Sequence, residues 1–207
     1  MNNRIQLSEN IQNGIIFPFG PGLVYDRVSD DIVNFLKDSG QRSKLKNNDV
    51  KHRLTDSVDS WKLELFNEEK NILKSLVKEK IEKYIQTTTN NNLLSVISFD
   101  LDDPWINYQN ANDFNPSHYH PAAFSYIIYI DIPDKIRKES FEGPPTSLRG
   151  LIEFSYNNAQ YIINPKANDM ILFPSEIYHS VNPFNSDVVR ISVAGNVHNV
   201  QVSVNNI

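Results

Sequence analysis

Three histidines are the residues of this chain whose types and spacing could bind a metal ion. His118 and His120 are separated by one residue, and His179 follows much later in the sequence. Side chains of a β-strand alternate between its two faces, so residues i and i+2 point to the same side. His118 and His120 could therefore bind one ion from one strand, while His179 reaches it from another. Three protein ligands would leave coordination positions open, as a catalytic metal requires.

An arginine in the last apolar stretch is a candidate for binding an acid. Arg190 begins the run Arg-Ile-Ser-Val-Ala-Gly, and Ser192 lies two residues later on the same strand face. A buried guanidinium needs a partner because burying its charge alone is costly, and it binds carboxylates in a bidentate fork. We therefore expect a ligand carboxylate beside Arg190. The alternatives are an ion pair within the protein or a solvated strand face.

The composition is that of an ordinary globular protein. Of the 207 residues, 40% are hydrophobic and 22% are charged, and the net charge is −5. A chain of this length is expected to form one domain that is large enough to enclose a pocket. The negative net charge gives no basic surface, so nucleic-acid binding through long-range electrostatics is not expected.

The sequence contains no cysteine, which excludes disulfides, zinc–thiolate sites and thiol nucleophiles. The first residues lack the apolar core of a signal peptide, and no run of about 18 apolar residues is present that could span a membrane. We therefore expect a cytoplasmic protein. Abundant asparagine suggests an AT-rich microbial or viral genome, and in the viral case the location would be the host cytoplasm.

Two amphipathic helices are expected before Asn92. The first would begin after Ser29, a favourable N-cap residue, and end near Ser39 because Gly40 follows. The second is expected over residues 63–85, where apolar residues recur at helical spacing. Its solvent-exposed face would carry Lys74, Lys78, Lys80 and Lys83. The polar residues between the two helices, 41–59, are expected to form a loop.

The remainder of the chain is rich in β-branched and aromatic residues and is punctuated by turn residues, which predicts strands. Asn157 and Asn158 favour a tight hairpin. A long polar insertion, residues 134–149, is expected to be a loop that could act as a lid or recognition element. The predicted strands are 93–99, 105–109, 122–132, 148–156, 160–163, 170–173 and 188–204.

Helices followed by strands predict an α+β, mainly β fold: a sandwich or jelly-roll barrel flanked by N-terminal helices. We expect a single domain over residues 1–207. Within it, residues 1–92 would supply a strand and the supporting helices, and residues 93–207 would form the jelly-roll core.

Residues 93–198 resemble the Fe(II)- and 2-oxoglutarate-dependent dioxygenases, most closely small microbial and phage-type members with prolyl-hydroxylase-like architecture. The order and spacing of several pieces carry this resemblance, and no single piece would. The pieces are Trp105-Ile-Asn107, Asn115-Pro-Ser-His118-Tyr-His120-Pro, Ser125-Tyr-Ile-Ile-Tyr129-Ile, Leu172-Phe-Pro-Ser175 before His179, and Arg190-Ile-Ser192. The resemblance implies a double-stranded β-helix, which is the jelly roll of this family.

The resemblance also implies a set of Fe(II) ligands. The family usually binds iron through His-x-Asp/Glu and a distal histidine, and His118 and His179 match the two histidines. His120 stands where the carboxylate would be, which makes the protein ligands neutral. Imidazole remains a good Fe(II) ligand. Asp113 is the alternative carboxylate, because it lies nearby in the sequence.

The same resemblance implies a 2-oxoglutarate site. Arg190 matches the residue that pairs with the distal carboxylate, with Ser192 as its hydroxyl partner and Tyr129 as a supporting tyrosine. Asn107 matches a position that contacts the keto-acid end. Two further residues are expected on the same strand faces, namely Asn196 and Trp105. Trp105 would line the substrate pocket or fill the core.

The activity that this family implies is the oxidative decarboxylation of 2-oxoglutarate by dioxygen, coupled to hydroxylation of a substrate C–H bond. A peptide substrate is suggested only by analogy with prolyl hydroxylases, and a fold-level analogy is a weak basis for naming a substrate. Dioxygen and an unidentified substrate would be the other partners.

Two alternatives remain at this stage. One is a cupin-type metalloprotein whose three histidines bind Fe, Mn or Ni without 2-oxoglutarate, and the other is a non-enzymatic β-sandwich binding or virion module. Arg190 and Ser192 favour the dioxygenase, since a cupin needs no keto-acid clamp there. His52 and His198 are not expected to have a functional role.

Overall fold

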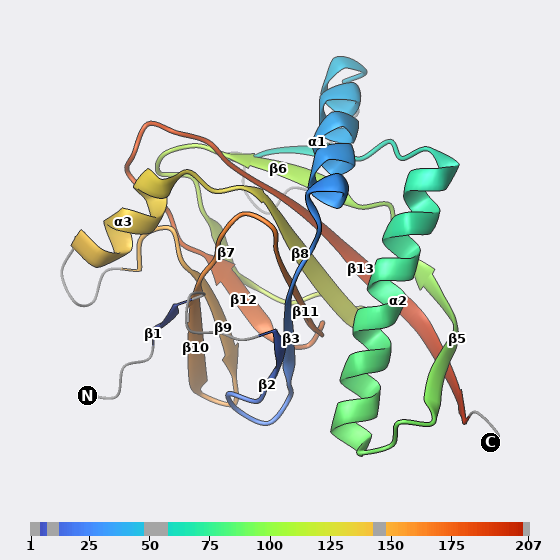
Figure 1. Ribbon diagram of the computed structural model, residues 1–207. Helices are drawn as coiled ribbons and strands as arrows, with labels where there is room; N and C mark the ends of the chain where they lie inside the picture. The colour runs from blue at the N-terminus through green and yellow to red at the C-terminus, as the bar shows by residue number, and fades with distance from the viewer. Residues whose placement is uncertain (1–4, 8–12, 48–57, 143–147, 205–207) are drawn as a thin grey trace.

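The computed structural model describes residues 5–7, 13–47, 58–142 and 148–204. Two β-sheets lie face to face, and α1 and α2 cover the outer side of the larger sheet (Figure 1). The elements are β1 (Ile5–Leu7), β2 (Gly14–Ile16), β3 (Leu23–Arg27), α1 (Asp30–Leu45), β4 (Asp59–Lys62), α2 (Asn67–Thr89), β5 (Leu94–Leu101), β6 (Trp105–Gln109), β7 (Asn115–His118), β8 (Phe124–Asp131), α3 (Asp134–Glu142), β9 (Ile152–Tyr156), β10 (Ala159–Asn164), β11 (Asp169–Pro174), β12 (Tyr178–Val181) and β13 (Arg190–Val204).

The strand order explains how distant parts of the sequence meet. The larger sheet runs β2-β3-β11-β8-β13-β6-β4, with β5 paired to β13, and the smaller sheet runs β1-β10-β9-β12-β7. All pairs are antiparallel except β1 with β10. The described strands form two open sheets rather than a closed barrel, and the predicted α+β, mainly β architecture is confirmed.

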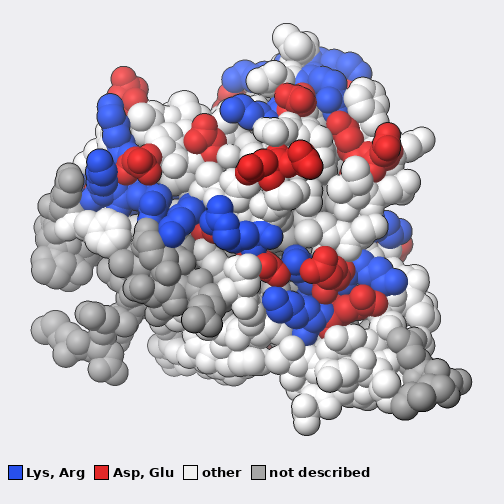
Figure 2. Space-filling model, in the orientation of Figure 1, with Lys and Arg blue, Asp and Glu red and all other residues white. Residues whose placement is uncertain are grey.

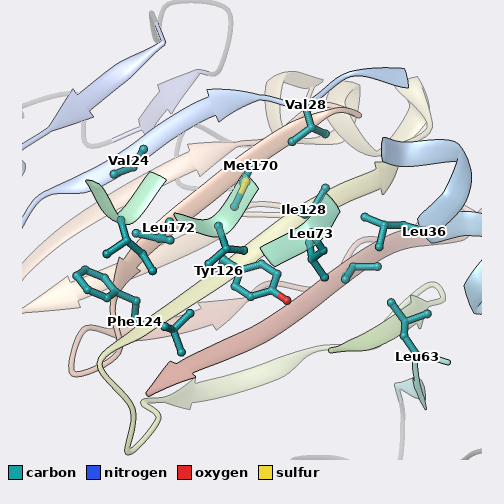
Figure 3. Packing of buried hydrophobic residues seen from close by; sticks show 14 of the residues in the cluster. Val24, Val28, Leu36, Leu63, Leu73, Phe124, Tyr126, Ile128, Met170 and Leu172 are labelled. Carbon is teal, nitrogen blue, oxygen red and sulfur yellow. The ribbon is translucent and has the colours of Figure 1, made fainter. Parts of the chain in front are cut away.

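Strand alternation divides the core into two layers. On β8, Tyr126 and Ile128 face the helices, whereas Ile127 and Tyr129 face the smaller sheet. Figure 3 shows the first layer, in which Tyr126 and Ile128 lie near Leu73 of α2. Burying an apolar side chain of this size contributes roughly 1.5–3 kcal/mol. Because the helices cover only one face of β8, the opposite face, which carries Ile127 and Tyr129, can line a site between the two sheets.

The first helix is longer than predicted. Ser29 occupies the N-cap position, although its side chain makes no capping hydrogen bond, and α1 continues past Gly40 to Leu45. Gly40 is buried, and a Cβ added there would lie 2.4 Å from Cδ1 of Ile106. The prediction that Gly40 ends the helix was wrong, because this glycine permits close packing on β6 instead. Of the predicted loop 41–59, residues 48–57, including His52, lie outside the described residues.

The second helix begins four residues later than predicted and has one buried lysine. Lys80, expected in solvent, is 4% exposed. Its Nζ lies 2.9 Å from Oδ2 of Asp26 on β3, and Lys83 contacts the same oxygen at 3.2 Å. Burial alone would lower the pKa of Lys80, but Glu79 and Asp26 outweigh burial and raise it. Figure 2 shows acidic and basic side chains interspersed on the face of the molecule that carries α1 and α2.

The predicted strands are largely confirmed, and Asn157 and Asn158 form the expected hairpin with φ of 46° and 64°. The predicted list missed the short strands β4, β7 and β12. The expected loop 134–149 begins instead with α3, and residues 143–147 lie outside the described residues. Among the described segments, no helix is long and apolar enough to cross a membrane.

Candidate active site

A cavity of about 330 Å³ is lined by all nine residues that the sequence placed in the site. Strands of both sheets contribute to it, because β7 and β12 belong to the smaller sheet and β6, β8 and β13 to the larger one. The nine residues are Trp105, Asn107, His118, His120, Tyr129, His179, Arg190, Ser192 and Asn196.

Strand pairing brings two of the three histidines together, whereas His120, expected on the same strand as His118, lies two residues past the end of β7. His118 on β7 lies directly opposite His179 on β12. The ring centroids are 4.2 Å apart for His118 and His179, 4.9 Å for His118 and His120, and 5.3 Å for His120 and His179. One nitrogen from each ring lies within 4.8 Å of the others. Three imidazoles at this spacing fit a single bound ion.

Backbone carbonyls orient two of the imidazoles. Nδ1 of His118 lies 2.8 Å from the carbonyl oxygen of Pro116, and Nδ1 of His179 lies 3.4 Å from that of Ile177. A carbonyl oxygen can only accept, so each Nδ1 is the protonated nitrogen in this contact. The lone pair is then on Nε2, which is the arrangement that a metal-binding histidine requires.

Burial keeps the three rings neutral. It lowers the pKa of His179 from its ordinary 6.5 to about 3 and that of His120 to about 4, and the neighbouring histidines act in the same direction. Burial also lowers the pKa of His118. Neutral imidazole is the form that binds metal, so these rings need no deprotonation near neutral pH.

The alternative ligands lie elsewhere. Oδ2 of Asp113 accepts a hydrogen bond of 2.8 Å from the backbone N–H of Asn110, in the turn before β7. His198 contacts Asp102 at 2.9 Å, outside the cavity. Within the part of the chain that the structure describes, no carboxylate joins the cluster, and His120 is its third member.

The buried Arg190 has only neutral partners. The residue is 2% exposed, and its Nε and Nη2 donate to Oε1 of Gln109 at 3.2 and 2.6 Å. Nη1 donates to the carbonyl oxygen of Gly150 at 2.5 Å, and the ring of Phe184 lies 5.6 Å away. No described carboxylate forms an ion pair with Arg190. A buried cation without a counter-charge is expected to bind an anionic ligand.

The hydroxyl of Tyr129 is a buried group without a hydrogen-bond partner among the described residues. Burial raises the pKa of Tyr129, while the positive charge of Arg190 opposes the rise, so the hydroxyl remains a donor. Buried polar groups are nearly always paired in native proteins. One carboxylate bound between Arg190 and Tyr129 would satisfy both, which is the fit expected for a 2-oxo diacid.

The remaining predicted residues line the same cavity. Ser192 lies opposite Asn107 across the β13–β6 pair, and Asn107 accepts a hydrogen bond of 2.6 Å from Ser60. Oδ1 of Asn196 accepts one of 2.9 Å from Ser125. Trp105 lines the cavity rather than the core, and its ring centroid lies 6.1 Å from that of His120.

The sequence analysis missed Gln109 and Gly150, the two acceptors for Arg190. Gln109 follows Trp105 and Asn107 at i+4 and i+2 on one face of β6, so strand alternation alone could have identified it. Gly150 had no comparable signal, because its carbonyl reaches the site through a turn and not through a strand.

The region that forms the cavity matches a known family. A family model described as "Putative 2OG-Fe(II) oxygenase" matches residues 103–196, which include all nine of these residues. Over these residues the chain is similar to the 2OG-Fe(II) oxygenases. Enzymes of that superfamily are oxidoreductases that use Fe(II), 2-oxoglutarate and dioxygen, and the match favours an enzyme over a binding module. No curated protein matches this chain.

Solved structures share the fold of this chain at low sequence identity. A prolyl-4-hydroxylase from Pseudomonas putida is 13% identical with a TM-score of 0.58, over 86% of this chain and 94% of that one. A Trichoplax adhaerens prolyl hydroxylase, in complex with a hypoxia inducible factor peptide, is 10% identical with a TM-score of 0.56, over 90% and 84%. A non-heme alpha-ketoglutarate-dependent epimerase from nogalamycin biosynthesis is 11% identical with a TM-score of 0.58, over 90% and 81%. The predicted double-stranded β-helix is thereby confirmed.

Proposed function

We propose that the protein is a 2-oxoglutarate-dependent oxygenase that acts as a hydroxylase, in which His118, His120 and His179 bind Fe(II) and Arg190 binds the distal carboxylate of 2-oxoglutarate. The observation that carries this proposal is a single cavity that holds three neutral imidazoles and a buried guanidinium without a counter-charge. A cupin-type site that uses no keto acid gives no reason for Arg190 to be buried without a counter-charge, or for the buried hydroxyl of Tyr129 to lack a hydrogen-bond partner, within the described part of the chain.

Iron and 2-oxoglutarate, when bound, would supply the oxidising chemistry: dioxygen converts 2-oxoglutarate to succinate and carbon dioxide, and its second oxygen atom is transferred to the substrate. The residues of this chain bind and orient the reactants. Arg190 and the hydroxyl of Tyr129 hold the distal carboxylate, and Ser192 adds a hydroxyl beside them. Asn107 contacts the keto-acid end, and Asn196 completes the wall. Ile127 of the larger sheet and Val181 of the smaller sheet also line the cavity, and these apolar side chains limit the access of water.

The outer part of the cavity suggests the kind of substrate. Tyr119, which lies between His118 and His120 in the sequence, lines the cavity and is 54% exposed. Its ring centroid lies 5.2 Å from that of Tyr178. Apart from the histidines, the only ionisable cation or carboxylate among the described lining residues is Arg190. The half-exposed Tyr119 marks the opening of the cavity, and this aromatic, uncharged mouth favours an uncharged, partly apolar substrate residue. We propose a peptide or protein substrate, with a prolyl side chain as the first candidate.

The test is an incubation with Fe(II), 2-oxoglutarate, air and a library of proline-containing peptides. We expect succinate, together with a peptide whose mass has increased by one oxygen atom. Succinate without any modified peptide would contradict the peptide assignment and direct the search to small molecules. Absence of succinate under all conditions, from a protein shown to bind metal, would contradict the hydroxylase assignment.

A further inference from the structure

We propose that Gln109 is a positioning residue that sets the keto-acid specificity of this oxygenase. Together with the carbonyl of Gly150 it forms a neutral cradle for Arg190, and the cradle selects keto acids that carry a second carboxylate. This inference rests on the proposed role of Arg190. It is carried by the three hydrogen bonds that Arg190 makes and by the absence of charge on their acceptors.

The cradle leaves a matched pair of donors free. A guanidinium has five N–H groups, and three of those of Arg190 are used, one on each nitrogen. One N–H therefore remains on each of Nη1 and Nη2. A carboxylate binds arginine through two parallel N–H groups, so the two that remain are the number that one carboxylate needs.

The cradle also leaves the positive charge uncompensated. The acceptors are an amide oxygen and a peptide oxygen, and the ring of Phe184 lies 5.6 Å from the guanidinium. A glutamate at position 109 would occupy nearly the same volume but would pair with Arg190 and compete with the ligand carboxylate. The amide of Gln109 thus fixes the arginine without neutralising it.

Both acceptors are themselves fixed. Gln109 is 5% exposed. Its Nε2 donates to the carbonyl oxygen of Asp113 at 2.5 Å, which turns Oε1 towards Arg190. Gly150 has a φ of +72° and donates from its N–H to the carbonyl oxygen of Pro183 at 2.9 Å. A Cβ at position 150 would lie 2.4 Å from Cγ2 of Ile136. The cradle is therefore preorganised before any ligand arrives.

The test compares the binding of two keto acids to the Mn(II)-loaded protein: 2-oxoglutarate, which has a distal carboxylate, and 2-oxobutyrate, which has none. For Gln109→Glu we expect 2-oxoglutarate affinity to fall about 100-fold, as for a disrupted charge pair. Affinity for Mn(II) and for 2-oxobutyrate should stay within about threefold of the wild type. For Gln109→Met, which removes the acceptor without adding charge, we expect a loss of about tenfold.

The change in the ratio of the two affinities is the decisive readout, because a general loosening of the fold would weaken both keto acids together. Arg190→Met separates this inference from the proposed function. If Arg190→Met binds 2-oxoglutarate as the wild type does, the proposed role of Arg190 fails. If it loses 2-oxoglutarate while Gln109→Glu keeps its preference, only the cradle is wrong. Should Gln109→Glu not fold, an unchanged preference in Gln109→Met would overturn the inference.

Discussion

At the scale of single residues, the third imidazole changes the charge of the proposed metal site. A carboxylate ligand would reduce the net charge of a bound divalent ion, whereas His120 leaves it unchanged. A more positive centre attracts a dianionic keto acid more strongly inside a low-dielectric cavity. The neutral ligand set and the uncompensated Arg190 therefore both favour 2-oxoglutarate over a neutral ligand.

The first prediction concerns the ligand set. His120→Ala should weaken Mn(II) binding by about 100-fold or more, since even outer partners of metal ligands contribute about 10–100-fold. The matched control is His198→Ala, which removes a histidine outside the cavity and should leave Mn(II) affinity unchanged. Equal affinities for the two variants, measured by titration, would remove His120 from the site.

The second prediction concerns pH. The pKa of His179 is about 3 in the folded protein and 6.5 as an ordinary value, so between these limits only the unfolded state binds the proton. The metal-free protein should therefore lose stability as the pH falls below about 6.5, by up to about 1.4 kcal/mol per pH unit from this ring. His179→Gln does not titrate and should show a shallower decline in urea unfolding between pH 6.5 and 4.5. Parallel curves would contradict the burial argument.

At the scale of elements, alternation along strands explains why the site residues could be predicted. Trp105, Asn107 and Gln109 share one face of β6, and Arg190 shares a face with Ser192 on β13. The strands β7 and β12 were harder to predict, because each has only four residues and β7 contains a proline. Their pairing, which sets the metal cluster, depends on long-range contacts that local sequence does not encode.

The two errors in the helices have the same origin. Gly40 and Lys80 have local signals for a helix end and for solvent exposure, and tertiary contacts override both. Gly40 lies against Ile106, and Lys80 is paired with Asp26. A long-range contact that the local sequence does not encode also involves α3. Its Glu139 accepts hydrogen bonds from two backbone N–H groups in the loop that leads to Arg190.

The third prediction follows from the contact at Gly40. Glycine to alanine normally stabilises a helix interior by about 1 kcal/mol. Here Gly40→Ala should instead destabilise the protein by about 1–3 kcal/mol, because the core has no space for the new methyl group. Ile106→Val removes the clashing Cδ1, so the double variant should recover part of the loss. A more stable Gly40→Ala protein in urea unfolding would refute the close packing.

At the scale of the whole molecule, the N-terminal part is integrated into the larger sheet. β3 pairs with β11, and β4 pairs with β6, on which three cavity residues lie. Ser60 of β4 also bonds to Asn107. We therefore propose that residues 1–207 form one cooperative domain. What the sequence could not predict at this scale is the substrate, since the mouth is formed by residues whose chemistry suits several uncharged groups.

The fourth prediction is a single unfolding transition. β3 and β4 belong to residues 1–92 but pair with strands of residues 93–207. The circular-dichroism signals of the helices and of the tertiary structure should therefore be lost together on heating. Circular dichroism in the far and near ultraviolet measures the two signals on one sample. Separate midpoints would show that residues 1–92 unfold independently.

The most direct test of the central claim is a thermal-shift titration of the metal-free protein with Mn(II), with and without 2-oxoglutarate. A ligand that binds only the native state raises its melting temperature. We predict that Mn(II) raises this temperature, that 2-oxoglutarate raises it further only when Mn(II) is present, and that Arg190→Met loses the second rise alone. No shift with Mn(II), or a Mn(II) shift to which 2-oxoglutarate adds nothing, would contradict a joint metal and keto-acid site.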